Sequence, residues 1–340
     1  MKKEKALHLA LIGTDSLRGR EIRNMLSTRE FPLASMEFFD TDVKEAYSKL
    51  TQFRGEPKVI AALNAESLEG IDLVFLAADK KTNRRVGRMA SSHGFAAIDL
   101  GEAFVDDRDV PVVVAGVNDR KILKKNPPLM ANPHPVTVIL SHVFSLMRRE
   151  SNIRRAVVVA LQPVSAFGEA GIQELANQSV DMLQSASIAK KVFKAQIAFN
   201  LLSQTTPTDN CGFSAEEKQI VQEVKDVLST RDFPLSVSLV QAPVFHTYSL
   251  MTFVELEQDV SMESLEAAFR ESAYFKFARP SRSCPVSSVA VAGRDEVFVG
   301  QLKKDAFLPK SYWLWSAADN LTRGSALNAF ETASALIGMM

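Results

Sequence analysis

A turn near the amino terminus carries glycines at the spacing of a phosphate-binding loop. Gly13, Ser16 and Gly19 follow the apolar run at residues 7–12 and precede a predicted helix. Glycines between a strand and a helix let backbone N–H groups approach a pyrophosphate. Ser16 stands where the middle glycine is expected, and Asp15 adds a negative charge. The turn by itself therefore indicates either a dinucleotide site or a structural connection between strand and helix.

A carboxylate at the end of the next predicted strand bears on which dinucleotide could bind. Asp40 follows the apolar run at residues 36–39. An acidic side chain at this place can accept a hydrogen bond from the ribose 2′-hydroxyl, and it repels a 2′-phosphate. If a dinucleotide binds, Asp40 favours NAD over NADP.

The two cysteines, Cys211 and Cys284, have no metal-ligand spacing and are too few for a disulfide framework. We therefore expect no metal cofactor and a reducing compartment, with the cytoplasm as the default. Basic and acidic residues both total 40, which argues against nucleic acid and anionic membranes as partners. No apolar stretch approaches the roughly 20 residues that span a bilayer.

Alternating apolar runs and helical stretches should position the glycine turn. This alternation over the first part of the chain predicts a doubly wound parallel sheet. The predicted strands cover residues 7–12, 36–39, 73–77, 96–100 and 110–114, and the predicted helices cover residues 20–26 and 81–91.

The later part of the chain has longer strand-like runs with fewer helices between them, which predicts an α+β domain with a mixed sheet. The predicted strands cover residues 155–161, 235–240, 249–256 and 286–291. Helices are expected at residues 171–184 and 325–337. A length of 340 residues with 46% hydrophobic content suffices for two such domains.

Four segments together resemble the aspartate-semialdehyde dehydrogenase family, and the resemblance covers nearly the whole chain. They are IDLVFLAADKKTNRRVGRMASSHGFAAIDLGEAFVDDRDVPVVVAGVN, ANPHPVTVIL, LQPVSAFGEAGIQEL and SAADNLTRGSALNAFETA. The resemblance implies a Rossmann-type dinucleotide-binding domain over residues 1–132 and a substrate and dimerisation domain over 133–318. It also implies that the final helix, within residues 319–340, returns to the first domain, and that the protein is a homodimer.

The family's reaction, as the resemblance implies it, reduces aspartyl phosphate with NADPH through a thiohemiacetal and a thioester. It requires a thiolate, an imidazole and cations for the substrate's phosphate and carboxylate. The resemblance places the cysteine nucleophile on Pro135, the histidine base on Tyr248 and the substrate arginine on Gln241. The phosphate-binding arginine falls on Val105, the serines before it become Leu100-Gly101-Glu102, and the 2′-phosphate pocket becomes residues 40–43.

Several other family residues are retained: Asn132, Gln162, Ser165, Gly168, one of Glu216 or Glu217, Asn320 and Gly324. The candidate cofactor-binding residues are Gly13, Ser16, Gly19, Asp40, Asn320 and Gly324. Asn320 either holds the nicotinamide amide or caps the final helix, because Asp-Asn before a helix also suits an N-cap.

Substitute groups for the missing chemistry are few, and each has a structural interpretation as well. His134 lies between two prolines, where a loop histidine with satisfied hydrogen bonds is the commoner case. His246 is two residues from Tyr248 and would share its face on a strand. Cys284 and Cys211 lie in predicted loops, where either could be a relocated thiol or an ordinary loop cysteine.

Three hypotheses about function follow. The first is a dimeric pseudoenzyme resembling the family's Usg-type side branch, with a residual small-molecule or dinucleotide site. The second is an oxidoreductase that transfers a hydride to an aldehyde or oxo group without a covalent intermediate, using Tyr248 or His246 as the acid. The third is the ordinary dehydrogenase, which requires one of the two cysteines at the active site.

Overall fold

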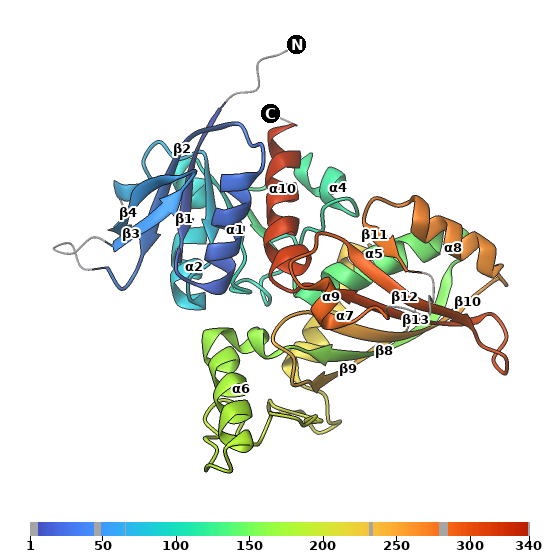
Figure 1. Cartoon of the computed structure of the whole chain (residues 1–340). Coiled ribbons are helices and arrows are strands. Elements are labelled where there is room, and N and C mark those ends of the chain that lie inside the picture. The colour runs from blue at the N-terminus through green and yellow to red at the C-terminus, as the bar shows by residue number, and fades with distance from the viewer. Residues whose placement is uncertain (1–5, 44–48, 65, 231–233, 279–284, 339–340) are drawn as a thin grey trace. The chain divides into compact units, whose positions relative to one another are not determined.

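The computed structural model describes residues 6–43, 49–64, 66–230, 234–278 and 285–338. The chain divides into two compact units (Figure 1). The first unit comprises residues 1–134 and 325–340, and the second comprises residues 135–324. The sequence-based boundaries lie at residues 132 and 318.

Within the described residues, the first unit contains a seven-stranded sheet of order β3-β4-β2-β1-β5-β6-β7. All its strand pairs are parallel except the β3–β4 hairpin at one edge. The strands are β1 (Leu7–Ile12), β2 (Leu33–Asp40), β3 (Lys49–Phe53), β4 (Glu56–Ala62), β5 (Leu73–Leu76), β6 (Ala96–Asp99) and β7 (Leu129–Ala131).

Helices cover both faces of this sheet, which confirms the predicted doubly wound fold (Figure 1). On one face, Leu9 and Leu11 pack with apolar residues of α1 and α10. On the other, Ala10 and Ile12 pack with residues of α2 and α3. The helices of this unit are α1 (Leu17–Thr28), α2 (Lys80–Gly87), α3 (Ala90–His93), α4 (Asp119–Leu123) and α10 (Leu327–Ile337), with a 3-10 turn at Glu66–Leu68.

The predicted strand at residues 110–114 is wrong. Val112 forms only an isolated bridge with Ala131. Side chains take the backbone donors that would continue a ladder: Val114 N–H donates to Asn118 and Ala115 N–H donates to Asn328. The apolar character of the segment reflects burial of a loop, which hydrophobicity cannot distinguish from a strand.

Among the described residues, the second unit holds a six-stranded mixed sheet of order β11-β12-β13-β10-β8-β9. The β8–β9 and β11–β12 pairs are parallel and the others antiparallel, as expected for an α+β domain. The strands are β8 (Ile153–Gln162), β9 (Leu235–Gln241), β10 (Tyr248–Leu256), β11 (Phe275–Phe277), β12 (Val297–Lys304) and β13 (Ser311–Ala318).

One face of this sheet is covered by α5, α7 and α8, whose apolar residues share a core with β8, β10 and β13. The predicted strand at residues 286–291 is wrong, because Ser287 accepts the Ala290 N–H and starts the short helix α9. The helices of this unit are α5 (Pro135–Glu150), α6 (Gly168–Leu183), α7 (Ala215–Val227), α8 (Met262–Glu271) and α9 (Ser288–Val291), with turns at Val164–Phe167 and Thr322–Ala326.

Candidate functional site

The glycine turn after β1 has the backbone packing of a tight strand-to-helix connection. Gly13 has φ +87°, and a Cβ atom there would lie 2.3 Å from the Ala78 nitrogen. A Cβ atom at Gly19 would lie 2.0 Å from the Gly13 carbonyl oxygen. Both positions therefore require glycine whether or not a ligand binds.

Ser16 is the N-cap of α1, so its hydroxyl already has two partners. It accepts the Gly19 N–H at 2.9 Å and donates to the Gly13 carbonyl at 2.9 Å. Capping in this way satisfies one of the free donors at the start of a helix. Ser16 thus stabilises the turn and occupies an N–H group that a bound phosphate could otherwise use.

Asp40, the last residue of β2, lies beside this turn and is 8% exposed. The Asp15 backbone N–H donates to its carboxylate, while Oδ2 has no hydrogen-bond partner among the described residues. Burial, followed by the charges of Asp15 and Asp42, raises the pKa of Asp40 to about 6. Lys49 pairs with Asp42 at 2.5 Å and with Asp15 at 3.4 Å. Among the described residues, the carboxylates of Asp15, Asp40 and Asp42 lie at this end of the sheet with Lys49, and the charge of Arg23 also acts on Asp15.

A second loop at the same sheet edge follows β6. The buried Asp99 carboxylate accepts the N–H groups of Gly101 and Ala103 at 2.9 and 2.6 Å. Burial raises the pKa of Asp99 even though these hydrogen bonds oppose the shift. Between the two donors, Glu102 pairs with Arg18 of α1 at 2.5 Å.

Asn132 and His134 follow β7 and are both buried. The Asn132 Oδ1 accepts a hydrogen bond from Asn328 of α10 at 2.8 Å. Asn328 also donates to the Val113 carbonyl at 2.8 Å, so it joins three segments of the first unit. Asn132 therefore has a structural partner in this chain.

Pro135 begins α5, and it is buried at the first helical position. Proline suits this position because its missing N–H would be unpaired there in any case. A Cβ atom at Gly324 would lie only 2.7 Å from the Pro135 Cβ, so the proline packs directly against the Gly324 backbone. The start of α5 offers neither a thiol nor a backbone donor at this residue.

Gln162, at the end of β8, brings several of the predicted site residues together. Its Nε2 donates to Glu216 Oε1 at 2.9 Å and to the Tyr248 hydroxyl at 3.0 Å. Gln241 lies beside it in register and donates to the Gln162 carbonyl at 2.9 Å. Glu217 instead forms the capping box of α7 with Ser214. Glu216 is therefore the member of the acidic pair that joins this cluster.

His246 does not lie on the strand that carries Tyr248. The strand β10 begins at Tyr248, and Thr247 between them has φ +82°. Strand alternation therefore does not apply, and the expectation that both side chains share a face is wrong. Tyr248 is buried, whereas His246 is partly exposed.

Asn320 is fixed within the second unit. It accepts the Thr247 N–H at 3.0 Å and exchanges hydrogen bonds with the Ser165 hydroxyl. Asp319, rather than Asn320, accepts the Leu321 and Thr322 N–H groups and caps the turn that leads into α10. The N-cap interpretation of Asn320 is therefore wrong by one residue.

Cys211 lies exposed in a loop of the second unit, and Cys284 lies outside the described residues. In the part of the chain that the structure describes, no group of three His, Cys, Asp or Glu side chains could hold a metal ion.

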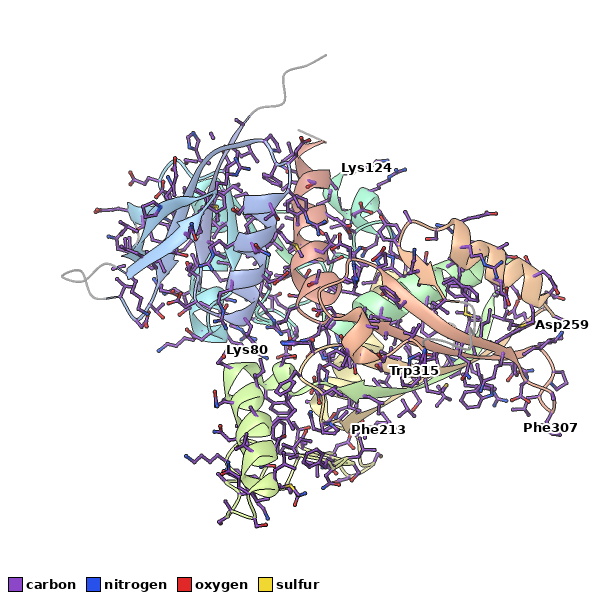
Figure 2. The ribbon with its side chains drawn as sticks, in the orientation of Figure 1. Lys80, Lys124, Phe213, Asp259, Phe307 and Trp315 are labelled. Carbon is purple, nitrogen blue, oxygen red and sulfur yellow. The ribbon has the colours of Figure 1, made fainter. Side chains whose placement is uncertain are left out.

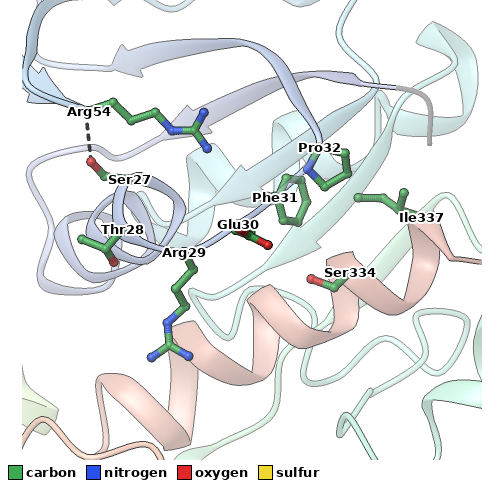
Figure 3. A pocket seen from close by; sticks show the side chains of 9 residues that line it. All are labelled: Ser27, Thr28, Arg29, Glu30, Phe31, Pro32, Arg54, Ser334 and Ile337. Atoms are coloured by element: carbon green, nitrogen blue, oxygen red, sulfur yellow. Dashed lines mark hydrogen bonds between the residues drawn. The ribbon is translucent and has the colours of Figure 1, made fainter. Parts of the chain in front are cut away.

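The first unit also holds an open pocket of about 630 Å3 between the end of α1 and α10 (Figure 3). It lies where β2 starts, whereas dinucleotides bind where parallel strands end. This pocket is therefore distinct from the glycine turn. Its lining residues are Ser27, Thr28, Arg29, Glu30, Phe31, Pro32, Arg54, Ser334 and Ile337.

Family models match both units. The semialdehyde dehydrogenase NAD binding domain matches residues 8–125, and the semialdehyde dehydrogenase dimerisation domain matches residues 144–323. The chain belongs to the semialdehyde dehydrogenase family. Membership confirms the resemblance read from the four sequence segments and supports a nucleotide cofactor for the first unit.

Relatives of this family match the chain along its length. The aspartate-semialdehyde dehydrogenase of Aquifex aeolicus is 29% identical, over 97% of each chain. The USG-1 protein homolog of Azotobacter vinelandii is also 29% identical, over 98% of each. The crystal structure of aspartate semialdehyde dehydrogenase II from Vibrio cholerae superposes with a TM-score of 0.92 at 25% identity, covering 98% of this chain and 99% of that one.

Sequence reasoning missed two features of the family fold as it occurs here. The Arg18–Glu102 pair joins residues that are 84 positions apart, so no local sequence pattern predicts it. Asn328 likewise lies in a stretch that was interpreted only as an apolar helix.

Among the helices of the described residues, none has the length and apolar character that a membrane span requires.

Proposed function

We propose that this protein is a dinucleotide-binding homodimer of the semialdehyde dehydrogenase family that does not carry out thiol-dependent chemistry on aspartate semialdehyde. The observation that carries the proposal is Pro135 at the start of α5, packed against Gly324. Covalent catalysis of this kind needs a thiolate, and a proline side chain has no nucleophilic atom.

The cluster around Gln162 supports the same proposal, because Gln241 stands where the resemblance places the family's substrate arginine. The amide of Gln241 donates to the Gln162 and Ala242 carbonyls. A substrate carboxylate is best held by an arginine that donates two parallel hydrogen bonds. Gln241 cannot supply that interaction, and Tyr248 supplies no imidazole to move protons near neutral pH.

Asp40 supports NAD as the preferred dinucleotide. The carboxylates of Asp15, Asp40 and Asp42 lie at the end of β2, where Lys49 pairs with Asp15 and Asp42. A 2′-phosphate at this place would meet like charge, whereas a ribose hydroxyl could donate to the free Oδ2 of Asp40.

The uncovered face of the second sheet supports a homodimer. Val157 and Val159 of β8 are 47% and 40% exposed, although they lie in the middle of a strand. Their cross-strand neighbours are Phe253 and Met251 of β10, which in turn pair with Trp313 and Trp315 of β13. Figure 2 shows Trp315 on the side of the sheet away from α5 and α8.

We call these six side chains, Val157, Val159, Met251, Phe253, Trp313 and Trp315, the apolar sheet face. Val157 and Val159 are its exposed members, whereas Met251, Trp313 and Trp315 are half-buried and Phe253 is buried. Exposed apolar side chains that adjoin other apolar ones mark an interaction site. In our proposal a second copy of the chain binds this face, because this unit matches the family's dimerisation domain and homodimers are the commonest oligomers.

The proposed location is the cytoplasm, because a chain with only two cysteines is typical of a reducing compartment.

Restoring the nucleophile tests the proposal. We expect Pro135→Cys to stay at background in an assay of phosphate-dependent oxidation of aspartate semialdehyde. The reason is that restoring one member of a catalytic unit restores little of the rate while the other members are missing. In Pro135→Cys, Gln241 still supplies no guanidinium and Tyr248 supplies no imidazole. The triple variant with Gln241→Arg and Tyr248→His is the comparison. Turnover by Pro135→Cys alone at the rate of an active relative would show that Gln241 and Tyr248 do not prevent the reaction, and turnover by the unmodified protein would overturn the proposal.

The second candidate function is hydride transfer without a covalent intermediate, with the Tyr248 hydroxyl as the acid. The observation that favours it is the buried Oε1 of Gln241, which has no partner among the described residues and could accept from a ligand. If this function is correct, Tyr248→Phe combined with His246→Ala abolishes NAD(P)H consumption with an aldehyde or ketone substrate. An unchanged rate in the double variant would exclude it.

A further inference from the structure

The loop after β6 holds a charged side chain in a strained backbone conformation. Glu102 has φ +55°, in the left-handed region that residues other than glycine rarely adopt. Such strain persists only where the surroundings enforce it, and it concentrates at functional sites.

Hydrogen bonds on both sides of Glu102 enforce this conformation. The buried Asp99 carboxylate accepts the N–H groups of the two flanking residues, Gly101 and Ala103. Arg84 donates to the Ala103 carbonyl at 2.5 Å. Gly101 has no space for a side chain, since a Cβ there would lie 2.2 Å from Asn83 Nδ2. These contacts therefore fix the loop without any contribution from the Glu102 side chain.

The Glu102 carboxylate is directed at a cation of another loop. Arg18, in the first turn of α1, donates to Glu102 Oε1 at 2.5 Å. Their side chains are only 30% and 18% exposed, so the pair is partly shielded from solvent. The loops after β1 and β6 both lie at the carboxyl ends of parallel strands, with β5 between them. This is the edge at which ligands bind in doubly wound sheets.

The surroundings of Glu102 are cationic beyond Arg18. Burial alone would raise the pKa of Glu102, but the charges of Arg18, His134 and Lys80 together hold it below its usual value. The largest of these charge effects is that of the Arg18 guanidinium, which contacts the carboxylate directly. A place of this kind, without the carboxylate, is a site for an anion.

We propose that Glu102 is a built-in anion, whose carboxylate fills an anion-binding place at the ligand-binding edge of the first sheet. Removing this side chain is then expected to open the place to inorganic phosphate. The inference rests on the proposed function and deepens it, because it names a group that excludes a phosphate-bearing substrate from the loop after β6. Its test uses neither a dinucleotide nor a semialdehyde, so either proposal can fail without the other.

The test compares Glu102→Gly with the unmodified protein. Glycine relieves the strain at φ +55°, so the variant should fold, and it removes both the charge and the bulk of the side chain. Thermal unfolding is followed as phosphate replaces chloride at constant ionic strength. We expect phosphate to raise the unfolding temperature of Glu102→Gly by about 2–4 °C more than that of the unmodified protein. Calorimetry should show phosphate binding about tenfold tighter or better in the variant.

Three further variants separate this effect from structural ones. Asn126→Gly also places glycine at a left-handed position of the first unit, at φ +47°, and should show no added response to phosphate. Glu102→Gln removes the charge but keeps the bulk, so its response should be smaller. Arg18→Gln combined with Glu102→Gly should lose most of the gain. An equal phosphate response in Glu102→Gly, Asn126→Gly and the unmodified protein would overturn the inference.

Discussion

At the scale of residues, the groups at the positions of the family's chemistry form hydrogen bonds within this chain, although Oε1 of Gln241 has no partner among the described residues. The Gln241 amide is held by backbone carbonyls, and Tyr248 accepts from Gln162. Asn132, which precedes Pro135, is held by Asn328. The resemblance could place the family's catalytic positions on these residues because each lies in a recognisable motif. It could not identify the new partners, since they come from residues far along the chain.

Asp40 gives a prediction at this scale. Its raised pKa means that the folded state is favoured by protonation, so this contribution to stability is lost as the pH rises through about 6. Asp40→Asn should remove the cost of burying the charge. We expect the variant to be more stable to urea by roughly 1–2 kcal/mol above about pH 7, allowing for solvent screening, with no gain near pH 4.

Asp42 provides the matched control for that measurement. Its carboxylate is exposed and paired with Lys49, whose hydrogen bond lowers the pKa of Asp42. Asp42→Asn should therefore give no stabilisation at neutral pH. Equal free energies of unfolding for Asp40→Asn and the unmodified protein across this pH range would show that Asp40 is not desolvated as described.

At the scale of elements, periodicity predicted only part of the long strands and helices. It did not predict the helices α5, α7 and α8 or the strands β12 and β13. The strands β8, β9 and β10 were each expected within two residues of their observed ends, since their alternation is regular. The hairpin of β3 and β4 was also missed, and of its two strands only β3 is mostly polar. Segments 110–114 and 286–291 were assigned as strands because apolar content alone does not distinguish a strand from a buried loop or a short helix.

The apolar sheet face gives the prediction at this scale. Val159→Asp places a charge on this face, at one of its two exposed members, and burying an unpaired carboxylate between two copies is costly. We expect light scattering to report a dimer for the unmodified protein and a monomer for this variant. Val59→Asp on β4 is the control, because Val59 is similarly exposed on a strand of the first unit and should leave the mass unchanged. A dimeric Val159→Asp would place the interface elsewhere.

At the scale of the whole molecule, the family, the Rossmann-type sheet and the mixed second sheet could all be predicted from the sequence. The reason is that they depend on motifs and patterns spread over the chain, which survive many substitutions. The Gln162 cluster and the Arg18–Glu102 pair could not be predicted, because each joins elements whose proximity is set by the fold. Chemistry therefore has to be judged from those contacts, since fold alone does not determine activity.

Turnover of aspartate semialdehyde by the unmodified protein tests the central claim most directly. The assay follows phosphate-dependent reduction of NAD and, separately, of NADP, with the Aquifex aeolicus relative as the positive control. Size is recorded in the same buffer, so that a folded dimer is established. We predict no rate above background with either dinucleotide, because the start of α5 carries Pro135 and no thiol. Substantial phosphate-dependent turnover would contradict the account and require a nucleophile elsewhere in the chain.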